Sequence, residues 1–285
     1  MVSPKILRRR IRSVQSTAKI TRAMEMIATA KMKRAQDMAL AGRPYSDKIR
    51  HVIADLSAQA AAGGATHPLL QKRPVNKIGI VHITSDRGLC GGLNTNLNKL
   101  VGNFILEQQA PVTVITVGTK GRDFMRRSMR DIRAEFVKMG DRPKLADTLA
   151  ISHIMIEDYT TGFFDQVYIS YSKFVNLMTQ KPTIELVLPV EPASLPKTAS
   201  PEYIFEPNAA KVLDELLPRF VEMQLYHDVL EAIASEQSAR MMAMRNATDN
   251  ANEVIADLTL TLNKARQEMI TKELLDIVAG VEGLK

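Results

Sequence analysis

The last part of the chain, from about Asn208 to Gly280, constrains the fold most because it predicts one very long helix. Glycine is absent from Ala209 through Ala279, and Pro218 is the only proline there. Apolar and small side chains recur at intervals of three and four residues, the heptad pattern of a helix that packs along another helix. They include Val254, Leu258 and Leu262. At about 1.5 Å per residue this helix would be about 100 Å long, so it needs a partner along its length.

The beginning of the chain carries a second heptad pattern, from Pro4 to about Leu56. Its members include Leu7, Ile11, Val14, Ala28 and Ala35. Ser3 before Pro4 fits a helix N-cap followed by proline at the first helical position. Up to Ser57 the chain has 13 Lys and Arg against 4 Asp and Glu, whereas from Ala209 onward it has 8 against 13. The two helices are therefore oppositely charged, which favours their pairing, although exposed ion pairs are individually weak.

These patterns predict an antiparallel two-helix coiled coil with a small Rossmann-like α/β domain inserted between its helices. We expect residues 1–57 to form the first helix, 58–76 a linker, 77–207 the α/β body and 208–285 the second helix. The second helix should extend past the first, and its end is apolar: Ile270, Leu274, Leu275, Ile277 and Val278. An isolated helix with that surface is poorly suited to water, so we expect another protein to enclose it.

The middle of the chain alternates strand and helix signals. Strands are predicted at 77–84, 112–117, 165–172 and 183–190, the last one pairing antiparallel in one interpretation. Helices are predicted up to about Gln109 and over 120–130 and 144–159. Such alternation favours a largely parallel sheet covered by helices. Two interruptions concern the long helices: Gly42-Arg43-Pro44 should bend or loosen the first, and Pro218 should kink the second.

The composition excludes several classes of protein. The single cysteine, Cys90, rules out an internal disulfide framework and a cysteine-based metal site. No apolar run reaches membrane-spanning length, and the basic N-terminus lacks the apolar stretch of a signal peptide. The net charge of +7 permits an anionic partner but does not identify one.

The glycine-rich turn Ser85–Asn94 is the main candidate for chemistry. A strand, such a turn and a helix can hold a phosphate, but neither of the two common nucleotide-binding glycine motifs is present. Cys90 at a helix start could be an activated thiol, although a packing or contact role fits a lone cysteine better. Tyr171-Ser172-Lys173 is better explained as a strand end than as an acid–base pair. We therefore predict no catalytic set, no cofactor and no metal.

The sequence resembles the gamma subunit of F-type ATP synthase over essentially its whole length. The resemblance rests on six runs in order: ITRAMEMIA from Ile20, KMKRAQ from Lys31, Arg43-Pro44-Tyr45, SDRGLCGGLN from Ser85, ASEQSARMMAMRNATD from Ala234 and NKARQEMITKELLDI from Asn263. It implies a noncatalytic rotor whose paired helices enter a ring of alpha and beta subunits. The body would bind the epsilon subunit and the membrane ring of c subunits, and ion flow would turn the assembly.

The resemblance also implies roles for individual residues. Contacts with the alpha/beta ring are expected at Met24, Arg240, Arg266, Gln267, Ile270, Thr271, Glu273, Leu274 and Ile277. Contacts with the c-ring or epsilon are expected at Tyr203, Phe205 and Cys90. The plant chloroplast members carry an inserted redox cysteine pair that this chain lacks, so thiol regulation is not expected. The implied location is the cytoplasmic face of a bacterial plasma membrane, as a peripheral subunit of the complex.

Two alternatives belong to other functional classes. The basic first helix could belong to a coiled-coil protein that binds nucleic acid, which would give DNA affinity a steep salt dependence. Its basic residues overlap the heptads instead of preceding them, which speaks against that function. A small nucleotide-binding enzyme with helical arms would instead bind ATP or NAD through the body alone. The rotor hypothesis requires co-purification with much larger ATPase subunits.

Overall fold

The computed structural model describes residues 3–62, 67–191 and 208–282. Its contacts divide the chain into two compact units. One unit spans Thr29–Ala239 and is called the body here. The other, called the helical end unit, contains the chain up to Ala28 together with the chain from Arg240 onward.

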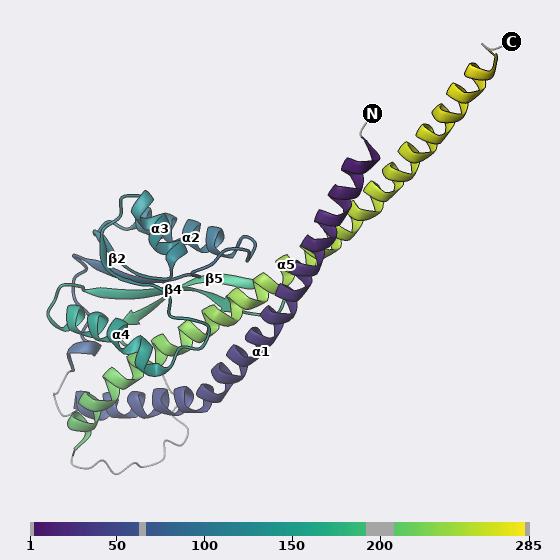
Figure 1. Cartoon of the computed structure of the whole chain (residues 1–285). Coiled ribbons are helices and arrows are strands. Elements are labelled where there is room, and N and C mark those ends of the chain that lie inside the picture. Colours follow the sequence, from purple (N-terminus) through teal and green to yellow (C-terminus); the bar gives the residue numbers. More distant parts are fainter. Residues whose placement is uncertain (1–2, 63–66, 192–207, 283–285) are drawn as a thin grey trace. The chain divides into compact units, whose positions relative to one another are not determined.

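The body contains a five-stranded mixed sheet in the order β3-β2-β1-β4-β5 (Figure 1). Its strands are β1 (Ile78–Ile83), β2 (Val112–Val117), β3 (Ile132–Phe136), β4 (Gln166–Phe174) and β5 (Gln180–Leu188). The first four strands are parallel, and β5 pairs antiparallel with β4. The chain moves from β1 to β2 and β3 on one side and returns to β4 on the other. In open α/β sheets, crevices form outside the carboxyl ends of strands at such a reversal of strand order.

Helices cover both faces of this sheet. On one face lie α2 (Leu93–Glu107) and α3 (Thr119–Arg127), which enclose a small core around Ile80, Val101 and Met125 (Figure 1). The other face carries a larger core. It joins the sheet to α4 (Leu145–Thr160) and to the body's portions of the two long helices, α1 (Pro4–Ala62) and α5 (Ala209–Glu282). A mixed α/β fold with a mostly parallel sheet is therefore confirmed.

The strands follow from their sequences. All six residues of β1 are buried, because a central parallel strand has helices against both of its faces. Strand β3 was not predicted. Its residues alternate half-buried and exposed, and the run IRAEF carries two charges, so its short pattern is weak in sequence. It becomes a strand by pairing with β2 at the sheet edge.

Both long helices run without a break through their predicted weak points. Helix α1 continues through Gly42-Arg43-Pro44 and extends over 59 residues. Helix α5 extends over 74 residues and contains Pro218 in its third turn. Pro218 lies inside α5, so the hydrogen bond to the carbonyl of Asp214 is missing there, and the kink expected at this position stays a prediction. The bend or loosening expected at Gly42-Arg43-Pro44 stays a prediction, because an unbroken helix can still bend. The proline-rich segment 192–207 lies outside the described residues.

Candidate functional site

In the helical end unit the first part of α1 lies beside a part of α5 (Figure 1). Thr21 on α1 and Thr248 on α5 are both buried, and their hydroxyl oxygens lie 2.7 Å apart. Thr21 Oγ1 is also placed to donate to Ala18 O at 3.1 Å, and Thr248 Oγ1 to Met244 O at 2.9 Å. Because a hydroxyl carries one proton, one threonine donates across the pair while the other donates within its own helix.

Other small and apolar side chains of the two helices are buried in the same unit. Leu7, Ala18 and Ala28 are buried on α1, and Met244 and Ala251 on α5. Ile11, Val14, Leu258 and Leu262, which the heptad pattern assigned to the contact face, are half-buried. Val254 differs, because 45% of its surface is exposed while the following residue, Ile255, is half-buried. The spacing 244, 248, 251, 255, 258 thus describes the buried face better than a register through Val254.

The far end of α5 is exposed and apolar. Large side chains there keep about half or more of their surface in solvent: Met269, Ile270, Leu274, Leu275, Ile277 and Val278. In a monomeric soluble protein a continuous apolar surface of this kind indicates a contact with another molecule. The tip of α5 is therefore a candidate interaction surface.

The residues expected to contact other subunits differ in exposure. Arg266, Gln267, Thr271 and Glu273 are exposed on α5. Met24 is half-buried, and Arg240 is 9% exposed. Cys90 is buried, and its Sγ lies 3.2 Å from Asn94 Nδ2, so its side chain packs inside the body. Tyr203 and Phe205 lie outside the described residues.

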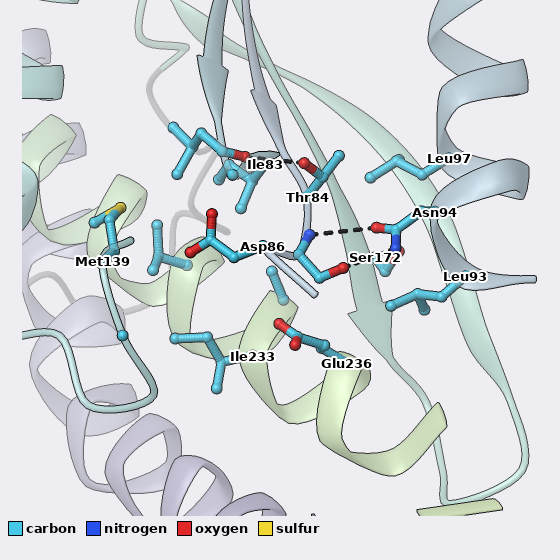
Figure 2. A pocket seen from close by; sticks show the side chains of 16 residues that line it. Ile83, Thr84, Asp86, Leu93, Asn94, Leu97, Met139, Ser172, Ile233 and Glu236 are labelled. Carbon is cyan, nitrogen blue, oxygen red and sulfur yellow. Dashed lines mark hydrogen bonds between the residues drawn. The ribbon is translucent and has the colours of Figure 1, made fainter. Parts of the chain in front are cut away.

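The glycine-rich turn lies at the carboxyl end of β1 and lines a small cavity against α5 (Figure 2). Asn94 organises the turn, because its Oδ1 accepts a hydrogen bond from Ser85 N at 3.2 Å and its Nδ2 donates to Ser85 Oγ at 2.7 Å. The carboxylates of Asp86 and Glu236 also line the cavity. The carboxylates of Asp86 and Glu236 would repel a phosphate, and the Ser85 backbone N–H already donates to Asn94. Both observations disfavour phosphate binding at this turn.

The Asp86 side chain accepts three hydrogen bonds from outside the turn. Its Oδ1 accepts hydrogen bonds from Thr119 N at 3.0 Å and Thr119 Oγ1 at 2.8 Å. Its Oδ2 accepts from Lys138 N at 3.0 Å. Asp86 therefore joins the turn after β1 to the segments that follow β2 and β3. The sequence motif was conspicuous, but nothing in it indicated this bracing role.

His82 and Asp228 are among the buried titratable groups of the body. His82 on β1 is fully buried, with Nδ1 2.9 Å from Ser170 Oγ and Nε2 2.8 Å from Asn98 Oδ1. Burial lowers its pKa to about 4, because the charged imidazolium cannot be hydrated there. Asp228 on α5 is 1% exposed, and its carboxyl pKa is raised by burial and by nearby Glu185 and Glu231. Sequence reasoning identified neither residue, since lone polar residues in apolar segments carry no distinctive signal.

The residues considered in the sequence as an acid–base pair lie within a strand. Tyr171, Ser172 and Lys173 form the last part of β4, as predicted. The Tyr171 hydroxyl donates to Glu185 Oε1 at 3.2 Å, and Lys173 Nζ lies 3.5 Å from the same oxygen. Within the described ranges, no group of three or more His, Cys, Asp or Glu residues could hold a metal ion. A search of the same residues finds no helix long and apolar enough to cross a membrane.

Comparison with known proteins identifies the class first. A family model described as ATP synthase matches residues 3–284. A structure titled as the rotor of Euglena gracilis mitochondrial ATP synthase is similar with a TM-score of 0.64 at 20% identity, covering 94% of this chain and 98% of that one. A central stalk and c-ring structure from Tetrahymena thermophila aligns with a TM-score of 0.62 at 24% identity, covering 80% and 99%. These structural matches support the fold.

The sequence relatives then specify the subunit. An ATP synthase gamma chain from Dehalococcoides mccartyi strain 195 is 58% identical over 284 residues and covers 100% of both chains. The gamma chain of Roseiflexus sp. strain RS-1 is 49% identical over 288 residues, covering 100% of this chain and 99% of the relative. The chain belongs to the ATP synthase gamma chain family, and the resemblance seen in its sequence motifs is confirmed.

Proposed function

We propose that this chain is the noncatalytic central-stalk rotor subunit of an F-type ATP synthase. It couples rotation of the membrane c-ring to conformational change at the catalytic sites of the beta subunits. The observation that carries this proposal is the match to gamma chains over the whole length of both sequences. Nothing in the comparisons favours the nucleic-acid-binding or nucleotide-binding alternatives.

The helical end unit supports a coiled-coil shaft. Several buried positions of the helical end unit are small, among them Ala18, Ala28 and Ala251, so the helix backbones can approach closely there. The Thr21–Thr248 contact fixes which turns face each other, because a buried hydroxyl needs a partner at one position along the helix. A shaft with a defined register can transmit torque without the two helices sliding past each other.

The exposed tip of α5 supports seating inside a ring of partner subunits. Ile270, Leu274 and Ile277 offer apolar contact, which is nondirectional and does not favour one angle of rotation. Polar contact, whose strength depends on the angle of rotation, is offered by Arg266, Gln267, Thr271 and Glu273. Met24 and Arg240 would face the lower part of the same ring. An asymmetric shaft then presents a different surface to each beta subunit, so that chemically identical sites differ in affinity.

The remaining partners follow from the family. We propose that the body binds the epsilon subunit and the c-ring, with Tyr203 and Phe205 near that contact. The buried Cys90 side chain would support the turn behind such a surface instead of forming it. The subunit is then peripheral to the membrane, on the cytoplasmic face of a bacterial plasma membrane.

Co-assembly tests the proposal. The chain is expressed with alpha, beta and epsilon subunits of a bacterial relative, purified through a tag on beta, and assayed for ATP hydrolysis and for rotation of a probe attached to the body. Co-purification at one copy per ring with ATP-driven rotation supports the rotor function. Failure to enter the ring, or ATP binding by the chain alone, contradicts it.

Truncation tests the seating of the tip. Removal of the residues after Leu274 is expected to reduce torque gradually, because the apolar contact is spread over several helical turns. Replacement of exposed Glu253 by Gln, on the same helix before the tip, serves as the control. Complete loss of assembly after removal of the last few residues alone would contradict a distributed apolar contact.

A further inference from the structure

One loop of the body contacts both long helices. Residues 137–144 connect β3 to α4, and we name this segment the collar loop. Asp141 in this loop uses both of its carboxylate oxygens. Oδ2 pairs with Lys31 Nζ on α1, and Oδ1 accepts a hydrogen bond of 3.4 Å from Gln237 Nε2 on α5. A single side chain therefore links the first and last helices of the chain to the loop that follows the sheet edge.

The backbone of the collar loop is braced by the glycine-rich turn. Lys138 and Gly140 have positive φ angles of 61° and 82°. A lysine rarely adopts that conformation, so it needs support from its surroundings. Lys138 N donates to Asp86 Oδ2 at 3.0 Å, and Asp86 is itself held by Thr119. Figure 2 shows Asp86 and Met139 lining the same cavity.

The collar loop is also fastened to α5 at its other end. The Tyr226 hydroxyl donates to Pro143 O at 3.2 Å, and Pro143 is buried. Met139 packs against the larger core of the body. The loop is thus held on both sides of Asp141, at Lys138 and Met139 before it and at Pro143 after it.

The positions that Asp141 contacts lie beside the border of the body. The body begins at Thr29 on α1 and ends at Ala239 on α5. Lys31 and Gln237 are each two residues inside this border. Gln237 is 2% exposed, so its amide has few alternative partners. The collar loop therefore contacts α1 close to the first residue of its body portion and α5 close to the last residue of its body portion.

We propose that the collar loop fixes the angular position of both long helices against the sheet, and that Asp141 is a positioning residue for torque transfer. The proposal rests on the proposed rotor function. The hydrophobic driving force is nondirectional, whereas the hydrogen bond and ion pair of Asp141 have preferred geometries and so add resistance to rotation of a helix about its axis. It also gives the glycine-rich turn a role without a phosphate, because Asp86 supports the loop that carries Asp141.

Hydrogen exchange on the full-length chain tests the contacts directly. Asp141→Asn keeps an acceptor for Gln237 but loses the charge that pairs with Lys31, Lys31→Met loses the same pair, and Asp141→Ala loses both contacts. Since Asp141 and Lys31 are partly exposed, amide exchange in residues 137–144 and 235–239 should rise about two- to fivefold in the alanine variant. The other two variants should show smaller and equal increases.

A matched control is Glu107→Gln, which removes one carboxylate from an exposed position at the end of α2. Its exchange in the collar loop should equal that of the unmodified chain. If Asp141→Ala leaves exchange in residues 137–144 and 235–239 unchanged, or changes it no more than Glu107→Gln, the proposed contact role is overturned.

The second arm measures coupling in the assembled synthase. Asp141→Ala and Asp86→Asn should lower the ratio of ATP-driven ion pumping to ATP hydrolysis and widen the angular fluctuations of a stalled rotor. The Glu107→Gln complex should keep the original ratio. Increased exchange with unchanged pumping ratio and fluctuations would overturn the positioning role. A chain that fails to assemble even without substitutions would instead contradict the proposed function, while the exchange arm would still report on the collar loop.

Discussion

Thr21 and Thr248, separated by most of the chain, place their hydroxyl oxygens 2.7 Å apart in a buried position between α1 and α5. Neither residue stands out in sequence, and each hydroxyl also lies within hydrogen-bond distance of a carbonyl oxygen of its own helix. This contact defines the register of the two helices more sharply than any apolar pair around it.

Replacing either threonine by valine should destabilise the helix pair. Thr21→Val leaves the Thr248 hydroxyl with only its own helix carbonyl as a partner, so we expect a loss of about 1 kcal/mol in the free energy of unfolding. The double valine variant should recover part of that loss, because no hydroxyl remains buried. Urea unfolding measures the free energy of unfolding of the original chain, the single variants and the double variant. Thr259→Val, at an exposed position of α5, is the control. Equal losses in single and control variants would refute the prediction.

Close packing of α1 can be tested at Ala28, which is 1% exposed. Ala28→Leu adds volume to a filled position and should cost about 1–3 kcal/mol of stability. In the assembled synthase, the displaced helices should also reduce ATP synthesis more than ATP hydrolysis. Ala30→Leu, at an exposed position on the same helix, is the control. Unchanged stability and coupling in Ala28→Leu would mean that the helices do not approach closely there.

His82 should make the body less stable in mild acid. Its pKa is about 4 in the folded chain against an ordinary value near 6.5, so the unfolded chain binds the extra proton first. The stabilising effect of the neutral ring is complete above pH 6.5 and is lost as pH falls toward 4. At about 1.4 kcal/mol per pH unit, the loss approaches about 3 kcal/mol.

The measurement compares urea unfolding of the original chain and His82→Gln from pH 7.5 to 4.5. The variant should be less stable at pH 7.5 because it disturbs the contacts to Ser170 and Asn98. Its stability should nevertheless fall less steeply below pH 6.5. Parallel pH profiles would exclude His82 as the source of the acid sensitivity.

Asp228 should lower the stability of the body at high pH, whereas His82 lowers it at low pH. Its carboxyl pKa is raised by burial, so the charged form present at high pH destabilises the folded chain. Asp228→Asn should therefore raise the free energy of unfolding near pH 8 by on the order of 1 kcal/mol. The difference should disappear as pH falls toward the ordinary carboxyl value. Glu215→Gln, exposed on the same helix, should show no comparable gain.

Gly118 should not tolerate a side chain. Its φ is 94°, and a Cβ there would lie 2.1 Å from Thr84 O. Gly118→Ala should cost more than the roughly 1–2 kcal/mol expected from the left-handed backbone alone. Gly91, with a φ of 58° and open space around it, provides the matched control. Thermal unfolding should therefore rank Gly118→Ala well below Gly91→Ala, and equal midpoints would contradict the predicted clash.

Much of the fold was accessible from sequence, for identifiable reasons. The strands β1 and β2 are mostly Ile and Val, as expected of central parallel strands, and β4 is rich in aromatic and β-branched residues although it also carries polar ones. The long helices were readable because heptads repeat over many turns. The sequence missed β3 because edge strands are short and polar, and its pairing with β2 supplies what its composition lacks.

Part of the candidate site could likewise be predicted from the sequence, and part of it could not. The exposed apolar tip around Ile270 and Leu274 was visible as a pattern. The contacts of Asp141 with Lys31 and Gln237 were not, because each is an ordinary surface-type residue and the partners come from distant segments. Cys90 illustrates the reverse case, since a conspicuous single cysteine proved to be a buried packing residue.

The sequence by itself determined the periodic features of this protein: two long helices, an alternating α/β segment and an apolar end. These depend on side-chain spacing along one segment, which the chain carries locally. Tertiary structure alone decided which hydroxyl meets which across the helices, what braces the glycine-rich turn, and which carboxylates are buried. Those outcomes depend on distances between segments far apart in sequence, and hydrogen bonds and desolvation are sensitive to such distances at the scale of an ångström.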